Sequence, residues 1–154
     1  MPVQATFTQL DEWTAVEEII PKSGRKLTLK YNLVQSIEDL IKMGELLCGI
    51  RDITHDTETS GLNVHLGARI IGHAFAAQTD AQELTSWYIP IRHINTTDYQ
   101  LPEKEVTDVV SEVLQAQGRA GYCHEKFDRI MSRADGIDIT RETHDVAIMA
   151  TIAN

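Results

Sequence analysis

The sequence predicts one α/β domain with a mixed β-sheet, because strand-like and helix-like patterns alternate along its 154 residues. Apolar and polar residues alternate over 27–34, as they do in a half-buried strand. Further strands are predicted at 50–58, 68–76 and 84–91. The short connection between the last two predicts that they pair as antiparallel neighbours. A chain of this length can bury a sizeable core within one domain.

Helices are predicted between and after these strands. Ser36 and Asp39 resemble a capping box, and apolar or small residues follow at helical spacing at Ile37, Leu40, Ile41, Gly44 and Leu47. Pro102 opens a second helix whose apolar face consists of Val106, Val109, Val110, Val113 and Leu114. The segment 119–125 is predicted as a further strand, with helices after it at 126–134 and 144–154.

The predicted organisation is a short N-terminal segment followed by one larger domain. Residues 1–26 are mixed in character and are expected to form a short helix or an arm. Residues 27–154 are expected to form the domain itself, with three antiparallel leading strands, one parallel strand and helices packed outside.

Composition narrows the class of protein. Hydrophobic residues make up 42% of the chain and charged residues 24%, as in a globular domain, and no apolar window is long enough for a membrane span. The two cysteines, Cys48 and Cys123, form no CxxC pair, so a reduced, cytoplasmic setting is expected. The net charge of −9 opposes long-range attraction to nucleic acid, so any such binding needs local cations.

Two acids lie close together in "THDTETSGLN", where the predicted strand 50–58 ends. Asp56 and Glu58 are two positions apart, so their side chains project from the same face of the strand. Like charges on one face repel, and a bound cation is a common way to offset that cost. Hard cations such as Mg²⁺ and Mn²⁺ prefer carboxylate oxygens. Taken alone, the pair also fits a solvated surface.

The order of several motifs resembles that of the 3′→5′ exonucleases of the DEDD superfamily, and most closely that of the proofreading domain of family A DNA polymerases. "DTETSGL" is similar to the first motif of that family, and "ARIIGHAFA" and "WYIPIRH" to the next two strands. "CHEKFD" resembles the second motif, with Asp128 in the acidic place and Cys123 and His124 where His and Asn are usual. The resemblance covers about 27–154.

The resemblance implies a ribonuclease-H-like fold and a divalent-metal mechanism for removing nucleotides from the 3′ end of single-stranded DNA. The expected catalytic and metal-binding residues are Asp56, Glu58 and Asp128. Thr57, Leu62 and His124 are expected to contact the nucleic acid, although Leu62 also fits a core residue beside a turn. Asp145 stands where the family has an acid at a helix start, so it is expected to cap backbone N–H groups.

The family's third motif, with the fourth carboxylate, lies farther along the chain than Asn154. The expected fold is therefore shortened at its C-terminus, and a two-metal site for Mg²⁺ or Mn²⁺ should be weakly occupied, with impaired activity. An edge exposed by the missing helices favours a second copy of the chain or a polymerase as partner. The alternative is a non-catalytic module that binds nucleic acid or protein.

Overall fold

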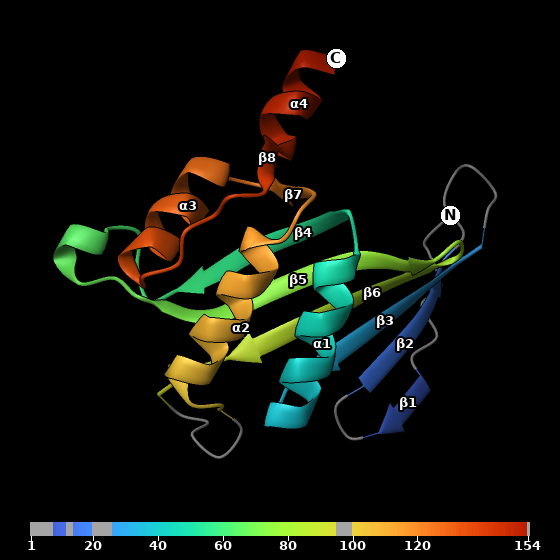
Figure 1. Cartoon of the computed structure of the whole chain (residues 1–154). Helices are drawn as coiled ribbons and strands as arrows, with labels where there is room; N and C mark the ends of the chain where they lie inside the picture. The colour runs from blue at the N-terminus through green and yellow to red at the C-terminus, as the bar shows by residue number, and fades with distance from the viewer. Residues whose placement is uncertain (1–7, 12–13, 20–25, 95–99, 154) are drawn as a thin grey trace.

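A mixed β-sheet forms the centre of the structure, a computed structural model that describes residues 8–11, 14–19, 26–94 and 100–153. The described residues form eight strands in the order β1-β2-β3-β6-β5-β4-β7-β8 (Figure 1). The strands are β1 (Thr8–Asp11), β2 (Thr14–Ile19), β3 (Leu27–Leu33), β4 (Asp52–Thr59), β5 (Ile70–Asp80), β6 (Glu83–Pro90), β7 (Arg119–Tyr122) and β8 (Glu142–Asp145).

The strand directions confirm the predicted mixed sheet. β4, β5 and β6 are antiparallel neighbours, and β7 pairs with β4 in parallel. Two more parallel pairs, β3 with β6 and β7 with β8, extend the sheet on either side. The structure thus has the α/β, ribonuclease-H-like fold that the sequence predicts.

The helices of the described residues are α1 (Ile37–Gly49), α2 (Glu103–Gln115), α3 (Glu125–Ala134), α4 (Val146–Ala153) and the short 3₁₀ helix η1 (Val64–Leu66). The predicted capping box starts α1: the backbone N–H of Asp39 donates to the Ser36 hydroxyl oxygen at 3.1 Å. Pro102 is the N-cap of α2, also as predicted. No helix among the described residues is both long and apolar enough to span a membrane.

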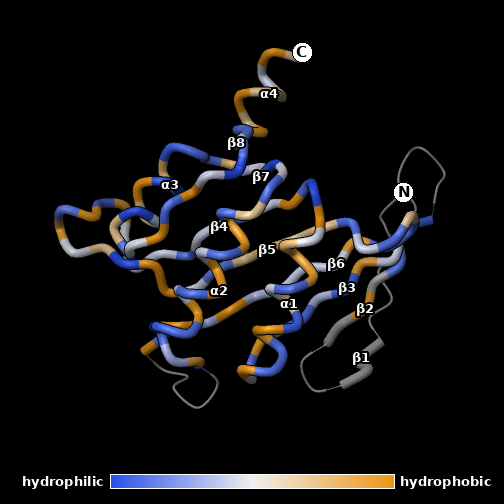
Figure 2. The backbone as a smooth tube through the Cα atoms, in the orientation of Figure 1, coloured by the Kyte–Doolittle hydropathy of each residue, from blue (hydrophilic) through white to orange (hydrophobic). Residues whose placement is uncertain are grey.

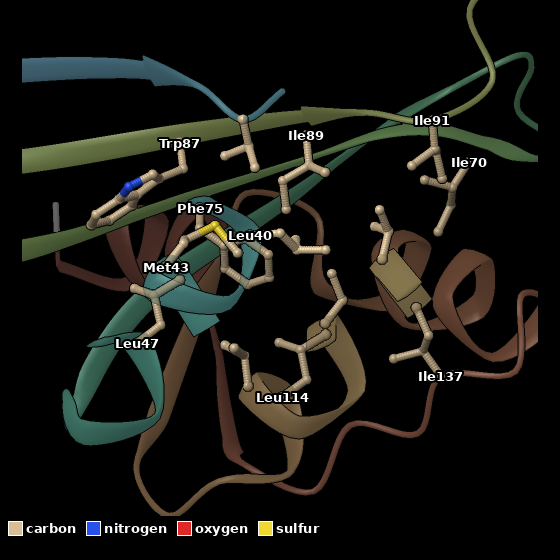
Figure 3. Close-up of a cluster of buried hydrophobic side chains, with 14 of the residues drawn as sticks. Leu40, Met43, Leu47, Ile70, Phe75, Trp87, Ile89, Ile91, Leu114 and Ile137 are labelled. Atoms are coloured by element: carbon tan, nitrogen blue, oxygen red, sulfur yellow. The ribbon is translucent and has the colours of Figure 1, made fainter. Parts of the chain in front are cut away.

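The hydrophobic core lies between the sheet and the pair α1 and α2, which run side by side across one face (Figure 1). Figure 3 shows how the side chains of the two helices meet those of β5 and β6. Leu40, Met43 and Leu47 of α1 are almost completely buried, but Ile37 and Ile41 of the predicted apolar face are 39% and 46% exposed. The face that α1 buries is therefore rotated from the predicted one.

Two parts of the chain differ from prediction. Residues 1–26 were expected to form a short helix or an arm, and the described residues between 8 and 19 form β1 and β2, of which β2 pairs with β3, so this segment extends the same sheet. His144 and Asp145 belong to β8, so the last helix begins at Val146 and not at His144. Figure 2 shows the apolar residues of α4, which extends away from the sheet, and its Ile152 is 80% exposed.

Candidate active site

The strand β4 presents Asp56 and Glu58 on its exposed face. Its residues alternate between exposed and buried, so both acids point to solvent while His55 and Thr57 point into the protein. Within the part of the chain that the structure describes, neither carboxylate has a hydrogen bond or an ion pair with protein. The spacing of two residues therefore places two free carboxylates side by side, as predicted from the period of a strand.

The third predicted acid, Asp128, comes to the same strand from α3. Its Oδ1 accepts the backbone N–H of Thr57 at 3.1 Å and the Thr57 hydroxyl at 2.6 Å. β7 pairs with β4 only from Asp52 to Thr54, so the backbone of β4 beyond that point is free to meet α3. Asp128 thus reaches the peptide that lies between the two exposed acids.

Asp128 is buried, with only 2% of the residue exposed. Desolvation raises the pKa of its carboxyl above the ordinary value, and the negative charge of Asp56 adds to the rise. The hydrogen bonds from Thr57 act in the opposite direction and lower the pKa.

The oxygen donors fit a divalent cation in part. Exposed carboxylates without protein partners are the ligands that Mg²⁺ and Mn²⁺ prefer, and Asp56 and Glu58 provide two of them. However, the described residues contain no group of three or more His, Cys, Asp or Glu side chains placed to hold one metal ion. One oxygen of Asp128 is already bonded to Thr57. The arrangement therefore suits a weakly held cation on the exposed pair.

The residues expected to contact nucleic acid lie in different environments. The Thr57 side chain is buried against Asp128, so its hydroxyl supports an acid of the site and does not face solvent. Leu62 is 86% exposed in the loop after β4, which is inconsistent with a core leucine. It borders a hollow of about 270 Å³ together with Leu66, which is 85% exposed.

His124 lies at the start of α3, beside a second hollow of about 390 Å³ that Phe127, Ile130 and Asp145 also line. Asp145 acts as the predicted cap. Its Oδ1 accepts the backbone N–H groups of Ala147 and Ile148 at 3.0 Å each, and its Oδ2 accepts that of Glu125 at 3.1 Å. These hydrogen bonds occupy both of its oxygens and lower its pKa.

A cluster of buried residues behind the acids was not assigned from the sequence. His55 and His73 are both 1% exposed, and their rings are joined by a hydrogen bond between Nε2 and Nδ1 of 3.1 Å. Burial lowers the pKa of both histidines, to about 4 for His73. The alternation of side chains along a strand could have indicated that His55 is buried, because it precedes the exposed Asp56 and must face the other way.

An ion-pair network fixes the far end of α3 to the sheet. Asp135, which ends this helix, accepts hydrogen bonds from Arg92 at 2.6 Å and from Arg69 at 2.8 Å. Its side chain is only 3% exposed, and Arg92 is 15% exposed, so this pair is largely withdrawn from water. The helix that brings Asp128 to β4 is therefore anchored at its other end as well.

Two more polar side chains near the acids were also left unassigned. Tyr88 of β6 and His93, just after that strand, are joined by a hydrogen bond of 2.7 Å between the phenol oxygen and Nε2. Both residues were visible in the segment "WYIPIRH", which contributed to the resemblance, but their contact depends on how the strand ends.

Comparisons with known proteins agree with this architecture. No family model matches the chain, and no curated protein matches it. The solved structure of Trypanosoma brucei RNase D in complex with RNA U12 has a TM-score of 0.56 at 16% identity, and another structure of that RNase D has 0.53 at 15%. A crystal structure of the Aedes aegypti Nibbler EXO domain has a TM-score of 0.48 at 12% identity, covering 97% of this chain and 60% of that one.

The likeness to RNase D covers 79% of this chain but only 39% of each RNase D chain. At this level of identity the likeness shows the fold alone: the chain shares the fold of the matched part of RNase D. The chain spans about two fifths of the length of these neighbours. The link to polymerase proofreading has no counterpart among these comparisons and stays a prediction.

Proposed function

We propose that this chain is a 3′→5′ exonuclease-like domain that binds the 3′ end of a single-stranded nucleic acid and hydrolyses its phosphodiester bond with a divalent metal. The observation that carries the proposal is the contact of a third acid, Asp128, with the strand that presents the two exposed acids. Asp56 and Glu58 project freely from β4, and Asp128 is bonded to the peptide between them. The exonuclease-like fold supports the same reading.

In this proposal Asp56 and Glu58 hold Mg²⁺ or Mn²⁺, and Asp128 helps to position a second, weaker ion. A divalent cation bound there would offset the charge of the scissile phosphate and lower the pKa of a bound water. Thr57 favours the charged form of Asp128, since its two donors point at one carboxylate oxygen. In this proposal Leu62 and His124 contact the terminal nucleotides.

The resemblance to polymerase proofreading domains implies that the substrate is single-stranded DNA. The RNase D structure, in contrast, was solved with RNA. Both sugars therefore belong in the test. A second copy of the chain, or a polymerase, remains the proposed partner.

Metal binding is tested first, by isothermal titration of Mn²⁺ into the native chain and the Asp56→Ala variant. The matched control is Asp52→Ala, which removes an acid from the same exposed face of β4 at its other end. Weak binding by the native chain and the control, lost in Asp56→Ala, supports the site. Equal heats from all three proteins would contradict it.

Hydrolysis is tested with 5′-labelled DNA and RNA oligonucleotides in Mg²⁺ or Mn²⁺. Stepwise shortening from the 3′ end, lost in Asp56→Ala and kept in Asp52→Ala, is the expected result. Mn²⁺ should support more activity than Mg²⁺, because Mg²⁺ demands more regular coordination.

A binding module without catalysis is the second candidate. It is favoured by one specific observation: among the described residues no three candidate ligands converge on a single ion position. Oligonucleotide binding without shortening, in either metal, would select this alternative over the exonuclease.

A further inference from the structure

Tyr88 projects from the same face of the sheet as the exposed acids, as the strand register shows. Asp56 pairs with Ala74, and Ala74 pairs with Tyr88, so Tyr88 projects from the same face as Asp56. Glu58 pairs with Gly72, one pair farther along the same face. The tyrosine is half-buried and therefore remains accessible from this face.

Gly72 makes room for the phenol ring beside Glu58. A Cβ at Gly72 would lie 2.2 Å from the Tyr88 hydroxyl oxygen and 2.5 Å from its ring carbon Cζ. The ring therefore lies over the glycine, in the place where a side chain opposite Glu58 would otherwise stand. Burial raises the pKa of Tyr88, and the negative charge of Glu58 adds to that rise.

His93 holds the phenol in that position. Its Nε2 is 2.7 Å from the Tyr88 hydroxyl oxygen. Its own backbone is held on both sides by the Gln100 side chain, which accepts from His93 N at 2.6 Å and donates to His93 O at 2.7 Å. The hydroxyl is therefore fixed at a defined point of an otherwise acidic surface.

An anionic strand lying over Asp56 and Glu58 requires hydrogen-bond donors to its phosphate oxygens, because the acids themselves only accept. We propose that Tyr88 is a phosphate-binding residue of the site, donating its hydroxyl to a phosphate oxygen of the bound single strand, and that His93 is the positioning residue that fixes Tyr88. This inference rests on the proposed function, since it takes the same acidic site to bind the strand.

The direction of the hydrogen bond follows from the bound state. When the hydroxyl donates to phosphate, its oxygen is left to accept, so Nε2 of His93 must carry the hydrogen and donate to Tyr88. The imidazole then serves as a donor that stabilises the oriented phenol, whichever charge it has.

The test measures binding of a fluorescent single-stranded oligonucleotide by anisotropy, with Ca²⁺ as an oxygen-preferring ion, and the oligonucleotide length is checked afterwards. Tyr88→Phe keeps the ring over Gly72 and removes only the hydroxyl. Affinity should fall about tenfold, the usual effect of losing one hydrogen bond to a charged group. The matched control is Tyr31→Phe, since Tyr31 pairs with Ser86 and lies on the same face farther from the acids.

The positioning role of His93 is tested separately. His93→Ala should weaken oligonucleotide binding when Tyr88 is present but should cause no further loss of affinity in the Tyr88→Phe variant. His93→Gln offers an amide donor, so its loss of affinity should be smaller than that of His93→Ala. Additive effects of the two substitutions would show that His93 acts independently of Tyr88. Gly72→Ala, which forces the phenol away from Glu58, should weaken binding as Tyr88→Phe does.

The outcomes separate this inference from the proposed function. Native binding in Ca²⁺ together with no shortening in Mg²⁺ or Mn²⁺ removes the hydrolysis and leaves the Tyr88 contact measurable. Native binding that is unchanged in Tyr88→Phe overturns the inference and leaves the proposed function standing. Absence of binding by the native chain overturns both.

Discussion

Thr57 donates two hydrogen bonds to one oxygen of Asp128, although the two residues are 71 positions apart in the chain. One donor is the backbone N–H at 3.1 Å and the other is the hydroxyl at 2.6 Å. This contact joins α3 to β4 at the point between the two exposed acids. The hydrogen bonds between Thr57 and Asp128 therefore contribute to the stability of the fold and also hold Asp128 at the candidate site.

The first prediction concerns the Thr57 hydroxyl. Thr57→Val keeps the shape of the side chain and removes the donor, so the buried Asp128 loses a charge-assisted hydrogen bond. Unfolding free energy should fall by about 2 kcal/mol at pH 7, and urea denaturation measures it. Thr57→Ser should keep most of the stability, and Thr54→Val, on the exposed face, should change little. Equal stability of Thr57→Val and the native chain would contradict the contact.

The second prediction concerns the charge of Asp128. Its pKa is raised in the folded state, so the folded protein binds more protons than the unfolded one at pH values just above the ordinary 3.8. Stability from this group therefore falls as the pH rises through that window. Asp128→Asn should be at least as stable as the native chain at pH 7, with its advantage shrinking toward pH 4. An advantage that grows on acidification would be inconsistent with a raised pKa.

The third prediction concerns the buried histidine pair. Burial lowers the pKa of His73 in the folded chain to about 4, whereas in the unfolded chain it is near 6.5. Between pH 6.5 and pH 4, His73 is therefore protonated mainly in the unfolded chain. Stability from this group is present above pH 6.5 and is lost as the pH falls, by about 3 kcal/mol at pH 4.

Urea denaturation at several pH values measures the slope. His73→Gln should show a shallower loss on acidification than the native chain, whatever its stability at pH 7. His65→Gln, at an exposed position, is the control and should keep the native slope. Parallel slopes for His73→Gln and the native chain would refute the assignment.

The fourth prediction concerns the turn before β7. Gly118 has a φ of +134°, and a Cβ there would lie 2.2 Å from the carbonyl oxygen of Arg51. Gly118→Ala should lower the unfolding free energy by more than about 2 kcal/mol, because an alanine there has a strained backbone conformation and its Cβ clashes with the Arg51 carbonyl oxygen. Gly49→Ala meets no atom within 4 Å and serves as the control. Thermal denaturation of the two variants should separate them clearly.

The local features of this protein were determined by the sequence itself. Asp56 and Glu58 share a face because side chains alternate along any strand, and Ser36 caps α1 because its partner Asp39 is three residues away. Asp145 caps α4 through equally near backbone groups. Such contacts need only local geometry, so the order of motifs was enough to predict the central strands and the fold.

The tertiary structure alone decided which distant groups meet. The sequence named Asp128, but its hydrogen bonds to Thr57 depend on where β7 stops pairing with β4. Similarly, the Tyr88 ring lies over Gly72, the strand partner of Glu58, only because the register of three strands places them so. The strands β1 and β2 form in the segment that was expected to be a short helix or an arm, since the pairing of β2 with β3 supplies hydrogen bonds that local preference does not include. Cross-strand and helix–sheet contacts are set by the packed chain as a whole, and for that reason a linear pattern does not contain them.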